Sequence, residues 1–129
     1  SMYQLLGDKV VDVQELIELF EKNDISIFEN VTKATKRDDA VGLRIKAPLS
    51  ETGIPNRVYD EDSMEEYMEK IEDIYRGKIQ AFLDESFGFS LYAYTYDEVT
   101  DSIILNFTMM DRATSRRKLP DIAKRLFDV

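Results

Sequence analysis

Residues 87–110 read FGFSLYAYTYDEVTDSIILNFTMM, and this stretch decides the fold. Apolar residues alternate with polar or tyrosine residues on both sides of the polar segment 97–101. The alternation runs through Phe87, Phe89, Leu91 and Ala93 before that segment, and through Ile103, Leu105, Phe107 and Met109 after it. A period of two is typical of a β-strand, and a polar break between two such runs is typical of a turn. We therefore predict an antiparallel β-hairpin.

The segment before the hairpin predicts a long amphipathic helix. Its apolar residues recur at steps of three and four: Met64, Tyr67, Met68, Ile71, Ile74, Tyr75, Ile79, Phe82 and Leu83. Ser63 and Glu66 have the spacing of a capping box, and Gly88 is placed to end the helix in a left-handed conformation. We expect a helix over residues 64–86, with Gly77 as a point of bending or close approach.

The first half of the chain predicts a helix followed by a second hairpin. Asp12 is a suitable N-cap for a helix over residues 13–22, with Glu15 in capping-box position. We expect strands over 25–34 and 41–47, joined by the polar turn 36–39, and a loop over 48–57. Residues 57–59 suggest a short edge strand, and Pro120 suits the first turn of a short terminal helix.

These elements predict an α+β fold for residues 2–129, taken as one domain. The predicted order is α-β-β-(β)-α-β-β-α, with an antiparallel sheet of two hairpins packed against helices. The order alone does not decide whether both hairpins join one sheet. It is similar to that of small acidic secretion chaperones, and this resemblance implies a homodimer that binds a client segment.

Composition favours binding over catalysis. The chain has no cysteine and no histidine, which excludes disulfides, thiolate metal sites and imidazole-based acid–base chemistry. There is no glycine-rich phosphate loop and no calcium-loop spacing of acids, so we expect no enzyme activity, no cofactor and no metal. No apolar run is long enough to cross a bilayer and no leader is visible, so we expect a cytoplasmic protein without membrane contact.

The formal net charge of −9 is unevenly distributed along the sequence. Residues 60–101 hold 13 acids and 3 bases, whereas residues 102–129 hold 3 acids and 6 bases. In the predicted long helix, one polar side carries the carboxylates of Asp62, Glu65, Glu66, Glu69, Glu72 and Asp73. Such a row could imitate a phosphate backbone and bind a basic partner, or it could be an ordinary solvated helix face.

Two further surfaces are candidates. Alternation places Tyr92, Tyr94 and Tyr96 on one face of the hairpin, where they could form a dimer or client interface or be covered by another element. A basic patch could hold RNA or phosphate, or could balance the acidic helices; it comprises Arg112, Arg116, Arg117 and Lys118, with Lys124 and Arg125 nearby.

The leading hypothesis is a non-enzymatic inhibitor or antagonist, of the kind encoded by phages or mobile elements. It presents the acidic helix to a partner with a basic surface, such as a nuclease or a nucleic-acid-binding protein. One alternative is an acidic homodimeric chaperone or adaptor that uses the tyrosine face. The other is a nucleic-acid-binding domain that uses the basic C-terminal segment, which the negative net charge makes less favourable.

Overall fold

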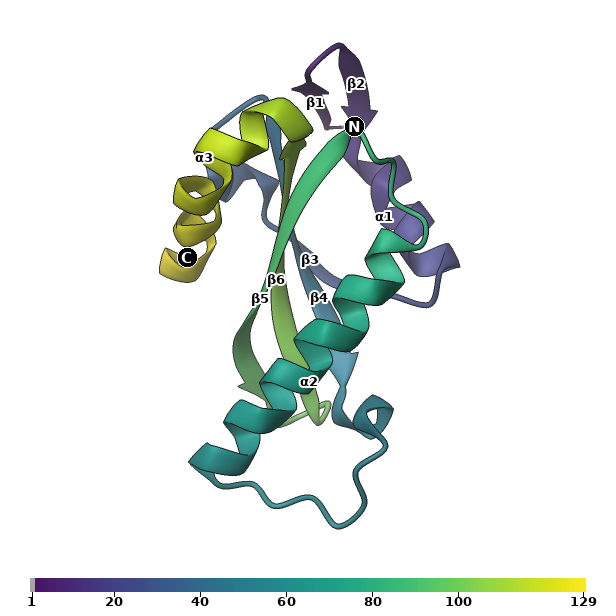
Figure 1. Cartoon of the computed structure of the whole chain (residues 1–129), viewed down its shortest axis with the longest axis vertical. Helices are drawn as coiled ribbons and strands as arrows, with labels where there is room; N and C mark the ends of the chain where they lie inside the picture. Colours follow the sequence, from purple (N-terminus) through teal and green to yellow (C-terminus); the bar gives the residue numbers. More distant parts are fainter. Residues whose placement is uncertain (1) are drawn as a thin grey trace.

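A four-stranded antiparallel sheet lies at the centre of the computed structural model, which describes residues 2–129 (Figure 1). The strands are β3 (Ser26–Asn30), β4 (Ala40–Pro48), β5 (Phe87–Asp97) and β6 (Ser102–Asp111), in the order β3-β4-β6-β5. The two predicted hairpins, β3-β4 and β5-β6, are both present. They share one sheet because β4 pairs with β6 from Ala40 opposite Met110 to Pro48 opposite Ser102.

The helices cover both faces of this sheet (Figure 1). On one face, α1 (Val13–Lys22) and α2 (Glu61–Gln80) bury side chains such as Phe20 and Ile71 against Leu43, Leu105 and Phe107. Full burial of each large apolar side chain stabilises the fold by about 1.5–3 kcal/mol. On the other face, α3 (Arg112–Arg125) forms a smaller apolar cluster through Ala40, Met110, Leu119 and Ile122.

The predicted first helix is confirmed from end to end. α1 spans Val13–Lys22, and the Asp12 carboxylate accepts a hydrogen bond of 3.0 Å from the Gln14 N–H. A short polar side chain at this position satisfies a backbone donor that has no partner within the helix.

The predicted ends of the second helix are wrong at both termini. α2 begins at Glu61 because Asp60, not Ser63, is its N-cap: the Asp60 carboxylate accepts the Ser63 N–H at 2.8 Å. It ends at Gln80, and a turn in which Asp84 accepts the Ser86 N–H leads into β5, so Gly88 is a strand residue and not a helix cap. In the described part of the chain, no helix has the combination of length and apolarity needed to cross a bilayer.

Three other predicted boundaries are corrected. β3 ends at Asn30, whose side chain then accepts the Thr32 N–H at the start of the 3-10 helix η1 (Thr32–Thr35). Residues 57–59 form no strand, and a second 3-10 helix, η2 (Leu49–Thr52), follows β4. α3 begins at Arg112 with Asp111 as its cap, so Pro120 lies inside the helix rather than at its start; η3 (Leu126–Asp128) follows it.

An N-terminal hairpin was not predicted from the sequence. β1 (Tyr3–Leu6) and β2 (Lys9–Asp12) pair around Gly7, which has a φ of 66°. Two apolar dyads that flank Gly7-Asp8 were the available signal, because glycine suits the positive φ of a two-residue hairpin turn. The Gln4 amide donates to the carbonyl oxygens of Arg37 and Ala40 and so attaches this hairpin to the start of β4.

Gly77 provides a test of the helix assignment. The close approach predicted at Gly77 is wrong: beyond its own helix backbone and chain neighbours, a Cβ here would meet nothing within 4 Å. The residue lies in the middle of α2 and is exposed to solvent. Gly77→Ala is expected to raise the free energy of unfolding by about 1 kcal/mol, because alanine loses less backbone entropy in a helix. Urea unfolding measures this change.

Gly88→Ala is the matched control, with the opposite expected sign. Its Cβ would overlap Ser115 Oγ, where α3 crosses the sheet closely. We expect it to lower the free energy of unfolding by about 1–3 kcal/mol through overpacking. A destabilised Gly77→Ala variant would show that residue 77 does not lie at an exposed position in the middle of a helix.

Candidate functional site

The acidic face predicted for the long helix lies on α2, and most of it points to solvent. Asp62, Glu65, Glu66, Glu69 and Asp73 are exposed, whereas Glu72 is half-buried. The Asp73 carboxylate forms an ion pair with the Arg76 guanidinium at 3.2 Å. The other four exposed acids and the neighbouring Glu61 form no ion pair within residues 2–129. Five carboxylates of α2 are therefore uncompensated by direct pairing.

Glu72 instead holds α2 against the outer edge of the sheet. Its carboxylate accepts a hydrogen bond of 2.6 Å from the backbone N–H of Ala93 in β5, and Arg76 donates to the Leu91 carbonyl oxygen at 3.0 Å. An unpaired strand edge is a template for pairing with another chain, and both contacts occupy its backbone groups. The contact with Ala93 therefore gives the Glu72 carboxylate a structural role within the chain.

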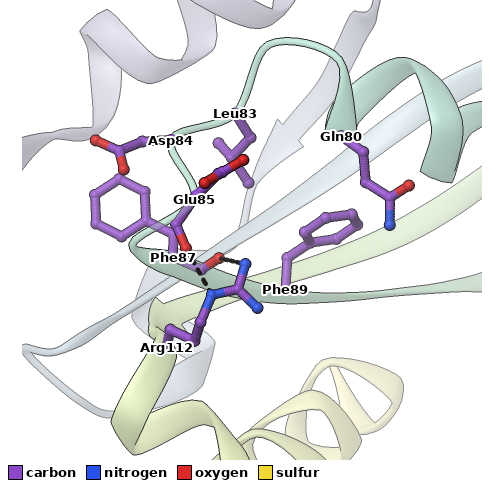
Figure 2. Close-up of a pocket in the computed structure, with 7 residues that line it drawn as sticks. All are labelled: Gln80, Leu83, Asp84, Glu85, Phe87, Phe89 and Arg112. Carbon is purple, nitrogen blue, oxygen red and sulfur yellow. Dashed lines mark hydrogen bonds between the residues drawn. The ribbon is translucent and has the colours of Figure 1, made fainter.

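Arg112, predicted to belong to the basic patch, occupies the same edge nearer the start of β5. Its guanidinium donates to the carbonyl oxygens of Glu85 and Phe87 at 2.6 and 3.1 Å (Figure 2). These contacts border a hollow of about 510 Å³ that Gln80, Leu83 and Phe89 also line (Figure 2). The remaining predicted cations Arg116, Arg117 and Lys118 are exposed on α3, on the side of the sheet opposite α2 (Figure 1).

The three tyrosines of β5 do not share one face. Tyr92 is opposite Asn106, but the register shifts between Ala93 and Thr95, so Tyr96 is opposite Ile103 and packs against the core under the helices. Such a bulge inserts one residue and reverses the alternation beyond it. The predicted tyrosine row is therefore wrong as a single surface.

The other two tyrosines stay on the α3 side of the sheet. Tyr92 is 50% exposed. The Tyr94 hydroxyl donates to the Val129 oxygen at 3.0 Å, and the Tyr94 ring lies 4.1 Å from the Arg44 guanidinium carbon. Only Tyr92 of this pair thus presents half of its surface for contact with another molecule.

A groove that was not predicted from the sequence lies where β5 continues beyond the bulge. The tyrosine groove, as we call it, has a volume of about 800 Å³ and is lined by Tyr59, Met64, Tyr96, Asp97, Glu98 and Val99. The ring centroids of Tyr59 and Tyr96 are 5.9 Å apart. Three separate segments form it: the loop before α2, the first turn of α2 and the end of β5 with the following turn.

Asp101 fixes the tyrosine hydroxyls beside this groove. Its carboxylate accepts hydrogen bonds from Tyr96 at 2.8 Å and Tyr59 at 3.1 Å, and it pairs with Arg57 at 2.8 Å. Burial and the bond to Asp101 raise the pKa of Tyr96 to about 12. Burial alone would raise the pKa of Asp101, but the hydrogen bonds from Tyr96, Tyr59 and Arg57 outweigh it and leave that pKa below its usual value.

Tyrosine rings and carboxylates thus line the same groove. Across residues 2–129, no group of three or more histidine, cysteine, aspartate or glutamate side chains is placed to hold a metal ion.

No family model matches the chain, and neither a curated protein nor a solved structure is detectably similar to it. Its function is therefore inferred from these surfaces alone.

The Asp101 network predicts a pH-dependent contribution to stability. Because its pKa is lower in the folded protein, the Asp101 carboxylate stabilises the fold above its unfolded pKa of 3.8, and this is lost as the pH falls through the lowered value. Asp101→Asn is expected to lower the free energy of unfolding at neutral pH by roughly 1 kcal/mol, because the network is partly exposed. The variant should lose less stability than the native chain on acidification. Unfolding measured across the acid range tests this, with exposed Glu98→Gln as the control.

The blocked strand edge predicts a change in self-association. Glu72→Ala combined with Arg76→Ala frees backbone groups at Ala93 and Leu91, so we expect concentration-dependent oligomers in sedimentation velocity. Glu69→Ala with Lys70→Ala removes one acid and one base from the exposed face of α2. This control variant should have the same association state as the native chain. Equal behaviour of the two double variants would contradict a protective role for the edge contacts.

Proposed function

We propose that this protein acts by binding a protein partner with a basic surface through the acidic outer face of α2. The observation that carries the proposal is that Glu61, Asp62, Glu65, Glu66 and Glu69 form no ion pair within residues 2–129. A surface helix of a stable monomer usually mixes both signs of charge on its outer face. Here Lys70 is the only base between residues 60 and 75.

The spacing of these carboxylates suits a basic groove that binds nucleic acid. Successive acids four residues apart, such as Glu61, Glu65 and Glu69, rise about 6 Å per step along the helix. A rigid row of charges at that spacing is an approximate copy of a strand of phosphates, and it attracts a basic partner over long range. We therefore favour an inhibitor or antagonist of a nuclease or another nucleic-acid-binding protein.

The two alternatives draw less support from the structure. A chaperone or dimer interface on the tyrosine row is weakened because Tyr96 lies on the opposite side of the sheet from Tyr92. Direct binding of nucleic acid through α3 is weakened because Arg112 and Arg125 donate to backbone carbonyl oxygens within the chain.

A charge-neutral variant tests the proposal. Glu65→Gln, Glu66→Gln and Glu69→Gln together remove three charges from exposed positions of α2. If the chain is used to capture partners from an extract of the source organism, the affinity for the captured protein should fall about tenfold or more. Binding by the native chain should weaken steeply as salt is added.

The matched control removes the same number of charges elsewhere. Glu15→Gln, Glu18→Gln and Glu21→Gln lie at exposed positions of α1 and leave α2 intact. This variant should bind as the native chain does. Equal loss in both variants would mean that only net charge matters, and no loss in either would contradict the proposal.

A further inference from the structure

We propose that the tyrosine groove is an anchoring pocket for an arginine side chain of the partner protein. The inference rests on the proposed function, because it assumes a basic partner, but it assigns the specific contact to a site outside the acidic face of α2. It is carried by the shape, the lining and the charge of the groove.

The groove is lined by two tyrosine rings, Tyr59 and Tyr96, that a guanidinium could contact. Tyr59 is 54% exposed and Val99 is 93% exposed at the tip of the β5-β6 turn, so the groove opens to solvent. Both tyrosine hydroxyls are held by Asp101, which fixes the ring orientations before any ligand arrives. A side chain that is ordered in advance loses less entropy on binding, and a cation over such a ring is stabilised by its electron-rich face.

Carboxylates line the same groove and favour a positive ligand. Asp97 and Glu98 form part of the lining, and no ion pair involves either of them within residues 2–129. Glu61 lies less than one helical turn from Met64, which also lines the groove, so the acidic face of α2 begins beside it. A partner that binds α2 would therefore place its neighbouring side chains at the groove.

The chain already uses arginine with the same groups. Arg57 donates to the Tyr59 hydroxyl at 3.3 Å and to Asp101 at 2.8 Å, next to the groove. On the other face of the sheet, the Arg44 guanidinium stacks on the Tyr94 ring. The planar guanidinium can stack on a ring and donate to a carboxylate at once, whereas a lysine ammonium is a compact point charge. These contacts favour arginine over lysine as the occupant.

The experiment is a titration of the isotope-labelled chain, followed by the chemical shifts of its backbone amides. The probe is the acetylated and amidated peptide Gly-Ser-Arg-Ser-Gly, and the control peptides carry lysine or uncharged citrulline in place of arginine. The arginine peptide should shift the amides of Tyr59, Met64 and Glu98 at millimolar concentration. The lysine peptide should bind more weakly and the citrulline peptide should cause no shift.

Two variants and a matched control locate the site. Tyr59→Leu removes one ring and should weaken binding by roughly threefold to tenfold. Because Tyr59 also contacts Asp101, a second variant, Val99→Lys, places a competing cation at a position that is 93% exposed and leaves that network intact. It should weaken binding similarly. Tyr92→Leu changes a tyrosine of comparable exposure, 50%, on the other face and should have no effect.

The remaining outcomes overturn the inference in distinguishable ways. Chemical-shift changes that spread along α2 and are the same in Tyr59→Leu and Val99→Lys would refute the groove as the arginine site. They would leave the proposed function intact. The absence of chemical-shift changes, or equal changes with the citrulline peptide, would also refute the groove as the arginine site. In that case, loss of partner capture in the α2 variant would still support the proposed function. Groove shifts that appear on concentrating the chain alone, and that vanish in Arg116→Ala with Arg117→Ala, would make a second copy the occupant.

Discussion

The hydrogen bond between the Glu72 carboxylate and the Ala93 N–H joins the longest helix to the edge of the sheet at the point where the register of β5 shifts. Without that shift, strict alternation would keep Tyr96 on the same face as Tyr92. With it, Tyr96 turns under the helices, reaches Asp101 and faces Tyr59. The contact that closes the strand edge and the shift that brings Tyr96 to the groove thus lie side by side in β5.

The two sides of the sheet are stabilised differently. Under α1 and α2 the contacts form one large apolar cluster, whereas the α3 side combines a small apolar cluster with polar contacts of Arg44. The Arg44 guanidinium is largely buried and donates to Asn106, to the Leu126 carbonyl oxygen and to the Val129 oxygen. Ser90 Oγ, Asn106 Nδ2 and Thr108 Oγ1 are buried on this same side without a hydrogen-bond partner among residues 2–129. The side under α1 and α2 is thus stabilised mainly by apolar burial, whereas the α3 side also depends on the hydrogen bonds of Arg44.

Sequence periodicity was sufficient for the elements that bury a continuous apolar stripe. α1 and both strands of the β5-β6 hairpin were found because their patterns reflect packing on one face. Between two possible caps close together, the pattern favoured the wrong one: Ser63 matches a capping box, but the Asp60 carboxylate accepts the Ser63 N–H. The bulge after Ala93 has no local signal in the sequence, and the carboxylate that contacts the Ala93 N–H belongs to Glu72, 21 residues away. The groove could not be predicted for the same reason, since it combines three segments that meet only in the fold.

The acidic face of α2 is itself unfavourable for the isolated helix. Like charges four residues apart destabilise a helix by about 0.2–0.5 kcal/mol per pair. Four such pairs lie in α2: Glu61 with Glu65, Asp62 with Glu66, Glu65 with Glu69 and Glu69 with Asp73. Two favourable pairs at this spacing, Glu66 with Lys70 and Glu72 with Arg76, oppose them. The core contacts of Tyr67, Ile71, Tyr75 and Ile79 are large enough to hold the helix despite this repulsion. A basic partner would relieve this repulsion when it binds. Part of the binding free energy would therefore come from electrostatic repulsion already present in the free chain.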